Sequence, residues 1–195
     1  KSALENQNIS YVTAHGEGAF YGPKIDLHVK DAIGRRWQLS TIQVDFAQPD
    51  NFDLQFVDSN NKRVKPVMIH RALLGSIERF TGILIENYAG EFPGWLSPVQ
   101  VKILTIGDVS NYVNKITKSL KGFRYEVDDR NLRLGEKLHD ASKDKVPISL
   151  IVGEKDELSN TLAINIRSQD NQQNVKYEDA MKQIKAHLKT PIFKI

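Results

Sequence analysis

A segment with two prolines and a glycine, EFPGWLSP at residues 91–98, divides the chain into two parts. Proline has no backbone N–H to donate and glycine is costly to confine, so neither a helix nor a strand is expected to continue through this segment. The hydrophobic pattern also changes here, from alternating strands before it to apolar runs and helical patterns after it. We therefore predict two domains, residues 1–96 and residues 97–195.

The first part has the pattern of a β-sheet. In residues 25–30, apolar side chains alternate with polar ones, as in a strand with one buried face. Residues 36–46 form a longer strand that carries polar side chains, and we expect it at the centre of an antiparallel sheet. A helix tail at 1–8, a loop at 47–52 and three further strands complete this prediction; the strands cover residues 9–14, 53–58 and 63–69.

The stretch VMIHRALLGSIERF at residues 67–80 passes from a strand into a helix. The predicted helix has an apolar stripe, Leu73, Ile77, Phe80 and Leu84, and a second line, Gly75, Arg79, Gly82 and Glu86. A glycine inside a helix costs about 1 kcal/mol relative to alanine, which close approach of a ligand or another backbone would offset. Arg79 would then suit a phosphate. The residues alone leave the alternative open: glycines for helix packing, Arg79 in a surface ion pair and His70 in the core.

The second part alternates strand and helix patterns. The runs at 99–106 and 147–152 are apolar throughout, as in strands buried on both faces. Helical periodicity appears at residues 109–121, 132–144 and 177–188, and shorter strands are predicted at 123–127, at 161–166 and near Val175, with a turn at 153–156. This order predicts an α/β domain with a mixed sheet and helices on its faces.

Composition narrows the class of protein. Apolar residues make up 40% of the 195 residues, enough for a packed core. No apolar stretch in the sequence is long enough to span a membrane, so no membrane partner is expected. The chain has no cysteine, which excludes disulfides and thiolate catalysis within it. Residues 97–195 hold 17 Lys/Arg against 13 Asp/Glu, a net +4, whereas the remainder is −1; this permits a nucleic-acid partner without requiring one.

Three separated motifs resemble the class II aminoacyl-tRNA synthetases. GSIERF at residues 75–80 resembles their motif 3, and the longer PVMIHRALLGSIERF resembles the threonyl-tRNA synthetase family in particular. GEGAFYGPKID at residues 16–26 and WQLSTIQVDF at residues 37–46 resemble the same family in the same order. The implied fold is α/β (α+β): the C-terminal part of the antiparallel class II catalytic sheet, then the mixed-sheet anticodon-binding domain shared by the threonyl, prolyl, glycyl and histidyl enzymes.

The resemblance implies roles for residues of the first part. Arg79 would bind the γ-phosphate of ATP and Lys24 would lie near the substrate carboxylate or the phosphate, which makes these two the candidate catalytic residues. The residues implied for the threonine and adenosine pockets are Tyr21, Gln38, Thr41, Gln43 and Ser76, of which Gln38 and Thr41 would also serve ATP. The alternatives are an ion pair of Arg79 with Glu78 or Glu86, and an ordinary hydrogen-bond network of polar side chains on the sheet.

His70 matches one of the three zinc ligands of the threonyl family, in which one Cys and two His hold a zinc that binds the amino group and hydroxyl of threonine. Ligation of the hydroxyl would reject valine, which an apolar pocket distinguishes poorly. Because this chain has no cysteine and one histidine cannot complete a zinc site, we expect the other ligands outside it. Leu39-Ser40 stands where many members have Cys-Gly, and the extra bulk of Ser40 could narrow the pocket floor.

The second part would bind an anticodon, whose unstacked bases are recognised by hydrogen bonds and stacking. Arg130 and Asn131 correspond to a pair used for this contact in the family. Other positions depart from the family's pattern: His139 and Lys145 stand where Arg is common, Asp156 replaces a Glu, and Asn165 stands where Arg is frequent. The alternative for each of these residues is an exposed charged face without a specific role.

The activity implied by the resemblance is the ATP- and Mg²⁺-dependent activation of threonine and its transfer to tRNA(Thr), by a cytoplasmic and homodimeric parent enzyme. The chain starts at Lys1 and lacks motifs 1 and 2, so we expect a fragment that is inactive alone. Two alternatives stay open: a non-catalytic tRNA-binding module, and a related class II enzyme such as the prolyl synthetase. His70 within MIHRA argues against the prolyl enzyme, since the zinc-bound threonine pocket belongs to the threonyl family.

Overall fold

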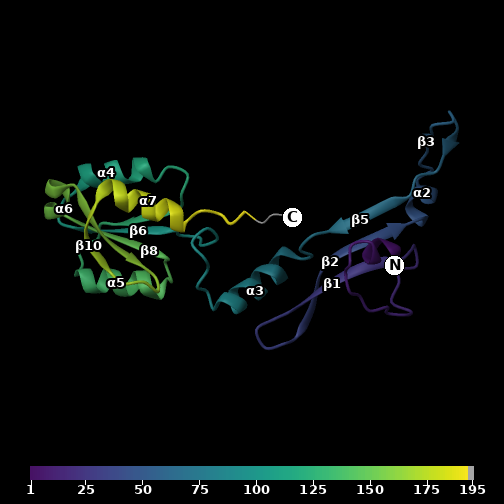
Figure 1. The fold of residues 1–195 in the computed structure, drawn as a ribbon, viewed down its shortest axis with the longest axis horizontal. Helices are drawn as coiled ribbons and strands as arrows, with labels where there is room; N and C mark the ends of the chain where they lie inside the picture. The colour runs from purple at the N-terminus through teal and green to yellow at the C-terminus, as the bar shows by residue number, and fades with distance from the viewer. Residues whose placement is uncertain (193–195) are drawn as a thin grey trace. The chain divides into compact units, whose positions relative to one another are not determined.

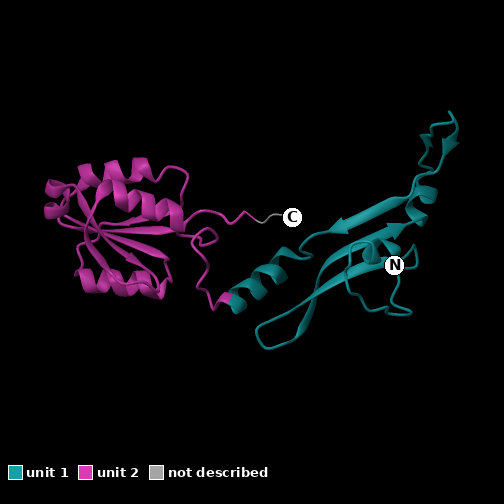
Figure 2. Ribbon diagram, in the orientation of Figure 1, with its two compact units in different colours: residues 1–87 teal, residues 88–195 magenta. Residues whose placement is uncertain are grey.

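The computed structural model describes residues 1–192, which form two compact units. Unit 1 ends at Asn87 and unit 2 begins at Tyr88 (Figure 2). Residues 88–96 are tied to unit 2: Arg167 Nη2 donates to the carbonyl of Phe92 at 2.5 Å, and Gln100 Nε2 donates to the carbonyl of Gly94 at 2.8 Å. The units therefore divide after residue 87, whereas the domain boundary predicted after residue 96 stays a prediction.

Unit 1 is built on a three-stranded antiparallel sheet in the order β1-β2-β5 (Figure 1). Its strands are β1 (Lys24–Lys30), β2 (Arg36–Asp45) and β5 (Met68–Ala72), so the long polar strand lies at the centre, as predicted. Helix α3 (Ile77–Tyr88) follows β5. The remaining elements are short: α1 (Ser2–Glu5), α2 (Ala47–Asn51), β3 (Phe56–Val57) and β4 (Arg63–Val64).

Unit 1 differs from the sequence prediction in four places. Of the strand predicted at 53–58, only Phe56–Val57 (β3) is formed. Residues 9–14, all described, form no strand. Residues 47–51 form helix α2 and not a loop, because the Asp45 carboxylate accepts the backbone N–H groups of Ala47 and Gln48 at 2.8 and 2.9 Å. The strand predicted at 63–69 is split into β4 and β5 around Pro66, which has no N–H for a sheet bond. Since β5 continues to Ala72, Gly75 precedes α3 instead of lying inside it.

Unit 2 is an α/β domain with a five-stranded mixed sheet in the order β10-β9-β8-β6-β7, which confirms the predicted class. The central strand β6 (Val101–Ile106) pairs in parallel with β7 (Tyr125–Asp128) and β8 (Ile148–Gly153). Strands β9 (Thr161–Ile166) and β10 (Gln172–Lys176) extend the sheet in antiparallel fashion. The turn predicted at 153–156 was wrong, because helix α6 (Glu154–Ser159) begins there. The Asp156 carboxylate accepts the Gly153 N–H at 3.0 Å and so caps the start of this helix.

Helices cover both faces of this sheet (Figure 1). On one face, α4 (Ser110–Ser119) and α7 (Tyr177–His187) pack against fully buried strand residues such as Ile103 and Ile148. Along β9, Leu162, Ile164 and Ile166 are buried toward that core, while the residues between them are half-buried on the opposite face. Helix α5 (Leu134–Lys143) covers the opposite face over β6. The surface next to α5 is therefore the more polar side of the sheet.

Candidate functional site

A continuous hydrogen-bond network joins Tyr21, just before β1, to polar side chains of β1 and β2 in unit 1. The Tyr21 hydroxyl donates to Gln43 Oε1, and Gln43 Nε2 donates to Thr41 Oγ1 at 3.2 Å. Thr41 Oγ1 in turn donates to Asp26 Oδ1 at 2.7 Å, and the other oxygen of Asp26 lies 2.7 Å from Lys24 Nζ. Four side chains implied for the substrate pocket, Tyr21, Lys24, Thr41 and Gln43, therefore meet in one place.

The strand register explains why these side chains meet. Lys24 lies opposite Gln43 and Asp26 opposite Thr41, so all four share one face of the β1–β2 pair. Burial alone would raise the pKa of Asp26, but hydrogen bonds from Lys24 and Thr41 outweigh burial and lower it. The hydrogen bond to Asp26 also raises the pKa of Lys24. Asp26 was not among the predicted site residues, although its spacing from Lys24 along an alternating strand places both side chains on one face.

His70 lies beside this network on β5, opposite Gln43 in the strand pairing. Its Nε2 is 2.8 Å from Asp45 Oδ2, and the rings of Tyr21 and His70 meet edge to face with centroids 6.2 Å apart. Asp45 is buried, and its burial tends to raise its pKa; backbone hydrogen bonds from α2 and the contact with His70 outweigh this and lower it. His70 is thus oriented by a buried carboxylate, with its side chain still 45% exposed.

Arg79 stands at the other end of β2. Its guanidinium carbon lies 5.7 Å from the centre of the Trp37 ring, and its Nη1 donates to the carbonyl of Gln38 at 3.4 Å. The predicted alternative, an ion pair with Glu78 or Glu86, does not form: among the described residues, Glu78 accepts from Ser76 and Glu86 pairs with Arg35. The charge of Arg79 therefore remains available to an anion.

Trp37 is held in place by a second arginine and a buried aspartate. Its Nε1 donates to Asp31 Oδ2 at 2.9 Å, and Arg35 Nε donates to the same oxygen at 2.6 Å. Burial favours a raised pKa for Asp31, but the hydrogen bonds from Trp37 and Arg35 dominate and lower it to about 2. Arg35 and Arg79 thus both lie near the Trp37 ring, yet only Arg35 has a carboxylate partner within residues 1–192.

Gly75 and Ser76, the two residues before α3, fix where the helix that carries Arg79 begins. Gly75 has φ of +66°, and a Cβ built there would lie 2.6 Å from the carbonyl oxygen of Leu39. Glycine is required at Gly75 because the turn approaches the backbone of β2 this closely. The expected close backbone contact is thus found at Gly75, outside the helix, and not at Gly82, where nothing lies within 4 Å of an added Cβ. Ser76 Oγ accepts the Arg79 N–H at 3.4 Å and donates to Glu78 at 2.6 Å, so Ser76 caps the helix.

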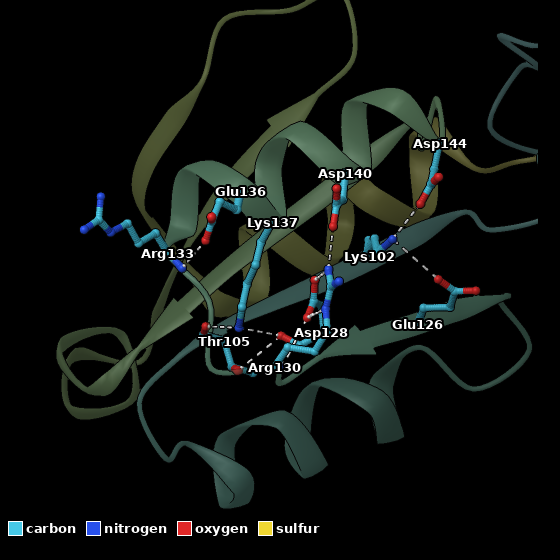
Figure 3. Close-up of polar contacts among 10 residues, drawn as sticks. All are labelled: Lys102, Thr105, Glu126, Asp128, Arg130, Arg133, Glu136, Lys137, Asp140 and Asp144. Atoms are coloured by element: carbon cyan, nitrogen blue, oxygen red, sulfur yellow. Dashed lines mark hydrogen bonds and ion pairs between the residues drawn. The ribbon is translucent and has the colours of Figure 1, made fainter.

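In unit 2, Arg130 is held between two carboxylates (Figure 3). Its Nε donates to Asp128 Oδ1 at 2.8 Å, and its Nη2 donates to Asp128 Oδ2 at 2.6 Å and to Asp140 Oδ2 at 2.7 Å. Hydrogen bonds to Asp128 and then to Asp140 raise the pKa of Arg130, and the same bonds lower the pKa of both carboxylates. Asp128 is buried, while the Arg130 side chain is 51% exposed.

The other residues predicted for anticodon contact do not form one cluster in the described part of the chain. Asn131 is next to Arg130, beyond the carboxyl end of β7, and His139 lines a hollow on α5. Lys145 and Asp156 flank the two ends of β8, and six residues of strand put about 20 Å between them. Lys145 lies 3.4 Å from Glu91, Asp156 caps α6, and Asn165 pairs with Ser149 in the β8–β9 register.

Within residues 1–192, no group of three or more His, Cys, Asp or Glu side chains is placed to hold a metal ion. No helix in the same range is long and apolar enough to cross a membrane. His70 is therefore a single candidate metal ligand in the described part of the chain, with its buried partner Asp45.

Comparison with known proteins assigns both parts of the chain. Residues 2–88 match the family described as tRNA synthetase class II core domain (G, H, P, S and T), and residues 100–187 match the family described as anticodon binding domain. The chain is 51% identical over 172 residues to threonine–tRNA ligase of Clostridium tetani, covering 87% of this chain and 27% of the relative. It is 44% identical to that of Clostridium acetobutylicum, covering 100% of this chain and 31% of the relative.

Two solved structures are similar. The RNA binding domain of threonyl-tRNA synthetase from Cryptosporidium parvum gives a TM-score of 0.82 at 30% identity, covering 95% of this chain and 48% of that one. A putative threonyl-tRNA synthetase from Aeropyrum pernix gives 0.64 at 29% identity, covering 96% and 46%. The chain thus spans less than a third of the length of the curated relatives named above. By these matches, residues 2–88 belong to the class II tRNA synthetase core family and residues 100–187 to the anticodon-binding family, and the chain is homologous to threonine–tRNA ligases.

Proposed function

We propose that this chain is the C-terminal part of a threonine–tRNA ligase, which activates threonine with ATP and Mg²⁺ and transfers it to tRNA(Thr). The observation that carries the proposal is the meeting of Tyr21, Lys24, Thr41 and Gln43 in one network beside His70, at the positions where the family's motifs have pocket residues. From the motif resemblance, the parent enzyme is proposed to be a cytoplasmic homodimer.

Activation joins the carboxylate of threonine to the α-phosphate of ATP, so negative charge on the phosphates must be stabilised by fixed positive groups. Arg79 is proposed to bind the γ-phosphate, since its guanidinium has no carboxylate partner within the described residues. Lys24 supplies a second cation near the reacting carboxylate, and Asp26 fixes where that cation sits. Holding both reactants in place is the main contribution that such a site makes.

The polar pocket residues serve both substrates. Tyr21, Gln43 and Ser76 are proposed to contact threonine or lie close to it, and Gln38 and Thr41 to line both the threonine and the adenosine pockets. In the structure Gln38 contributes its backbone carbonyl to Arg79, and Ser76 caps the helix that carries Arg79. Both residues would therefore also act on ATP through the position of Arg79.

His70 fits a zinc ligand in one respect. A histidine that binds a metal through one ring nitrogen commonly directs the other toward a carboxylate, and His70 Nε2 faces the buried Asp45. A zinc ion there would bind the hydroxyl of threonine and so discriminate against valine. One histidine is not a site, so the remaining ligands are proposed to come from the longer protein.

Unit 2 supports a second candidate function for the chain by itself, namely tRNA binding without catalysis. Its core is complete, and its family is described as an anticodon binding domain, which implies a tRNA partner. The residues proposed for base contact are Arg130, Asn131, His139, Lys145, Asp156 and Asn165. Of these, Arg130 and Asn131 are the best supported, because they adjoin each other on an ordered turn.

Threonine-dependent ATP–pyrophosphate exchange tests the proposal. The full-length protein is expected to exchange with threonine, far less with serine and not with valine, while the 195-residue chain alone shows no exchange. Zinc in the full-length protein and none in the chain would support His70 as one ligand of a shared site. Exchange by the full-length protein with proline in place of threonine would overturn the assignment.

A further inference from the structure

The hydrogen bonds of Arg130 leave it unsuited to grip a phosphate. Three of its five N–H groups are used, one on Nε and two on Nη2, and all three point to carboxylates. The two remaining N–H groups are both on Nη1 and make no hydrogen bond within residues 1–192. A bidentate fork to phosphate needs parallel N–H groups on two different nitrogens. Arg130 can therefore offer one nitrogen and the flat face of its guanidinium, but not the fork.

The charges around Arg130 also argue against a phosphate-binding site. The groove that contains it is lined by three cationic side chains and four carboxylates, so it carries no excess of positive charge. Lys102, the cation nearest the sheet, is itself paired with Asp144 at 2.8 Å and lies 3.8 Å from Glu126 (Figure 3). Binding of a phosphate backbone requires an accumulation of unpaired Lys and Arg, which this groove lacks.

Hydrogen bonds also hold the backbone next to the turn that carries Arg130. Lys137 of α5 is buried, and its ammonium donates to the backbone carbonyls of Thr105 and Asp128 at 2.8 and 2.9 Å. These carbonyls belong to the ends of β6 and β7, so Lys137 ties together the two strands that precede the turn (Figure 3). Asp128 then grips Arg130 from within the same turn, and Asp140 grips it from α5.

We propose that Asp128 and Asp140 are positioning residues, which hold the guanidinium of Arg130 so that it stacks on an unpaired nucleobase of RNA and does not bind a phosphate. The proposal rests on the tRNA-binding function of unit 2 and deepens it. Arginine planes are established stacking surfaces for unstacked bases, and a plane held in one orientation loses less entropy when a base arrives. Asp140 therefore favours RNA binding although its charge repels RNA.

That opposition of sign gives a decisive test. Asp140→Asn removes a negative charge that faces Arg130, whereas Asp144→Asn removes one at the C-cap of the same helix, where it faces Lys102 instead. The probe is an RNA hairpin carrying the anticodon loop of a threonine tRNA, compared with hairpins in which single anticodon bases are exchanged. Binding to the full 195-residue chain is measured over a range of salt concentrations.

The proposal predicts that Asp140→Asn lowers the preference for the matching hairpin by about tenfold, the value of one well-read base. Asp144→Asn should bind all hairpins equally or slightly more tightly, with the preference intact. Arg130→Ala should lose the preference without changing the salt dependence, whereas loss of a phosphate contact would reduce the salt slope by about one. Arg130→Lys should not rescue, because an ammonium has no plane.

Two outcomes would overturn the inference. If Asp140→Asn binds the matching hairpin more tightly and keeps its preference, the carboxylate acts only through its charge. If Arg130→Ala reduces the salt slope, Arg130 contacts phosphate. A wild-type chain that shows no preference among hairpins would instead contradict the proposed function, so failure of the inference and failure of the function are distinguishable.

Discussion

The two units differ in how completely they bury their own apolar side chains. In unit 2, residues from both sheet and helices form a closed core whose members are almost fully buried. In unit 1, Leu39 and Pro49 are the apolar side chains buried among the described residues, while Ile69 and Leu73 of the motif region are 65% and 63% exposed. The described residues of unit 2 thus bury a core of their own, whereas the sheet of unit 1 has apolar surface that the residues of unit 1 do not cover.

This difference separates two kinds of functional site. The Arg130 turn rests on a complete domain and is fixed by contacts within unit 2. The network from Tyr21 to Lys24 is also formed, but it lies on a sheet whose apolar side chains are largely exposed. We therefore expect RNA recognition to be a property of this chain and threonine activation to require the longer protein, in agreement with a chain that covers 27–31% of its relatives.

The largest effect is expected at Arg79. Arg79→Ala in the full-length protein should reduce threonine-dependent ATP–pyrophosphate exchange about 10²–10³-fold, the usual cost of removing one preorganised group that stabilises developing charge. Arg35→Ala is the matched control, because Arg35 lies near the same Trp37 ring but is paired with Asp31. Equal losses of exchange in both variants would show that the Trp37 surroundings matter and that Arg79 has no separate role.

The next largest effect is expected from core substitutions, which should change the stability of the two units to very different extents. Ile103→Ala removes a fully buried side chain of β6 and should lower the free energy of unfolding of unit 2 by about 2–5 kcal/mol. Ile69→Ala removes an exposed one from β5 and should change the stability of this chain by less than about 0.5 kcal/mol. Denaturant unfolding followed for each unit measures both. A large loss from Ile69→Ala in the isolated chain would mean that unit 1 buries this side chain after all.

Two glycines near Arg79 should respond with opposite signs. Gly75→Ala places a Cβ 2.6 Å from the Leu39 carbonyl at φ of +66°, and should destabilise unit 1 by about 1–3 kcal/mol. Gly82→Ala lies inside α3 with no atom within 4 Å of the new Cβ, and should stabilise by about 0.5–1 kcal/mol. Thermal unfolding distinguishes them. Destabilisation by Gly82→Ala would reveal a close neighbour at that face of the helix.

The smallest effect is expected on the stability of the protein at low pH. The pKa of Asp31 is about 2, below its ordinary value of 3.8, so its contribution to stability is complete above pH 3.8 and is lost as the pH falls toward 2. Trp37→Phe removes one donor to Asp31 and should move its pKa upward, toward the ordinary value. Carboxyl titration by NMR measures both values. An unchanged pKa in Trp37→Phe would assign the whole effect to Arg35.

The sequence predicted the fold of unit 2 more fully than that of unit 1, for a physical reason. The apolar runs of β6 and β8 and the helical period of α4, α5 and α7 are signals of burial within one domain, and the structure bears them out. In unit 1, residues 9–14 carry a strand pattern without forming a strand. A hydrophobic pattern in the sequence shows which side chains are apolar, but not which element packs against them.

Site residues could be predicted where they belong to a sequence motif. They could not be predicted where their role comes from a hydrogen-bond partner that only the fold brings near. The motifs led to Tyr21, Thr41, Gln43, His70 and Arg79, but the roles of Asp26, Asp31 and Asp45 depend on side chains that the fold brings to them. The same holds in unit 2, where Arg130 was predicted while Asp128, Asp140 and the buried Lys137 were not. A single sequence shows a charged residue but not the partner that orients it.

The most direct test of the division between the units is binding of RNA hairpins to the unmodified 195-residue chain. The chain is predicted to bind the hairpin with the threonine anticodon about tenfold or more tightly than hairpins with an exchanged anticodon base, even if overall affinity is weak. Equal binding of all hairpins, with a salt dependence typical of phosphate contact alone, would contradict the claim that anticodon recognition is complete within unit 2.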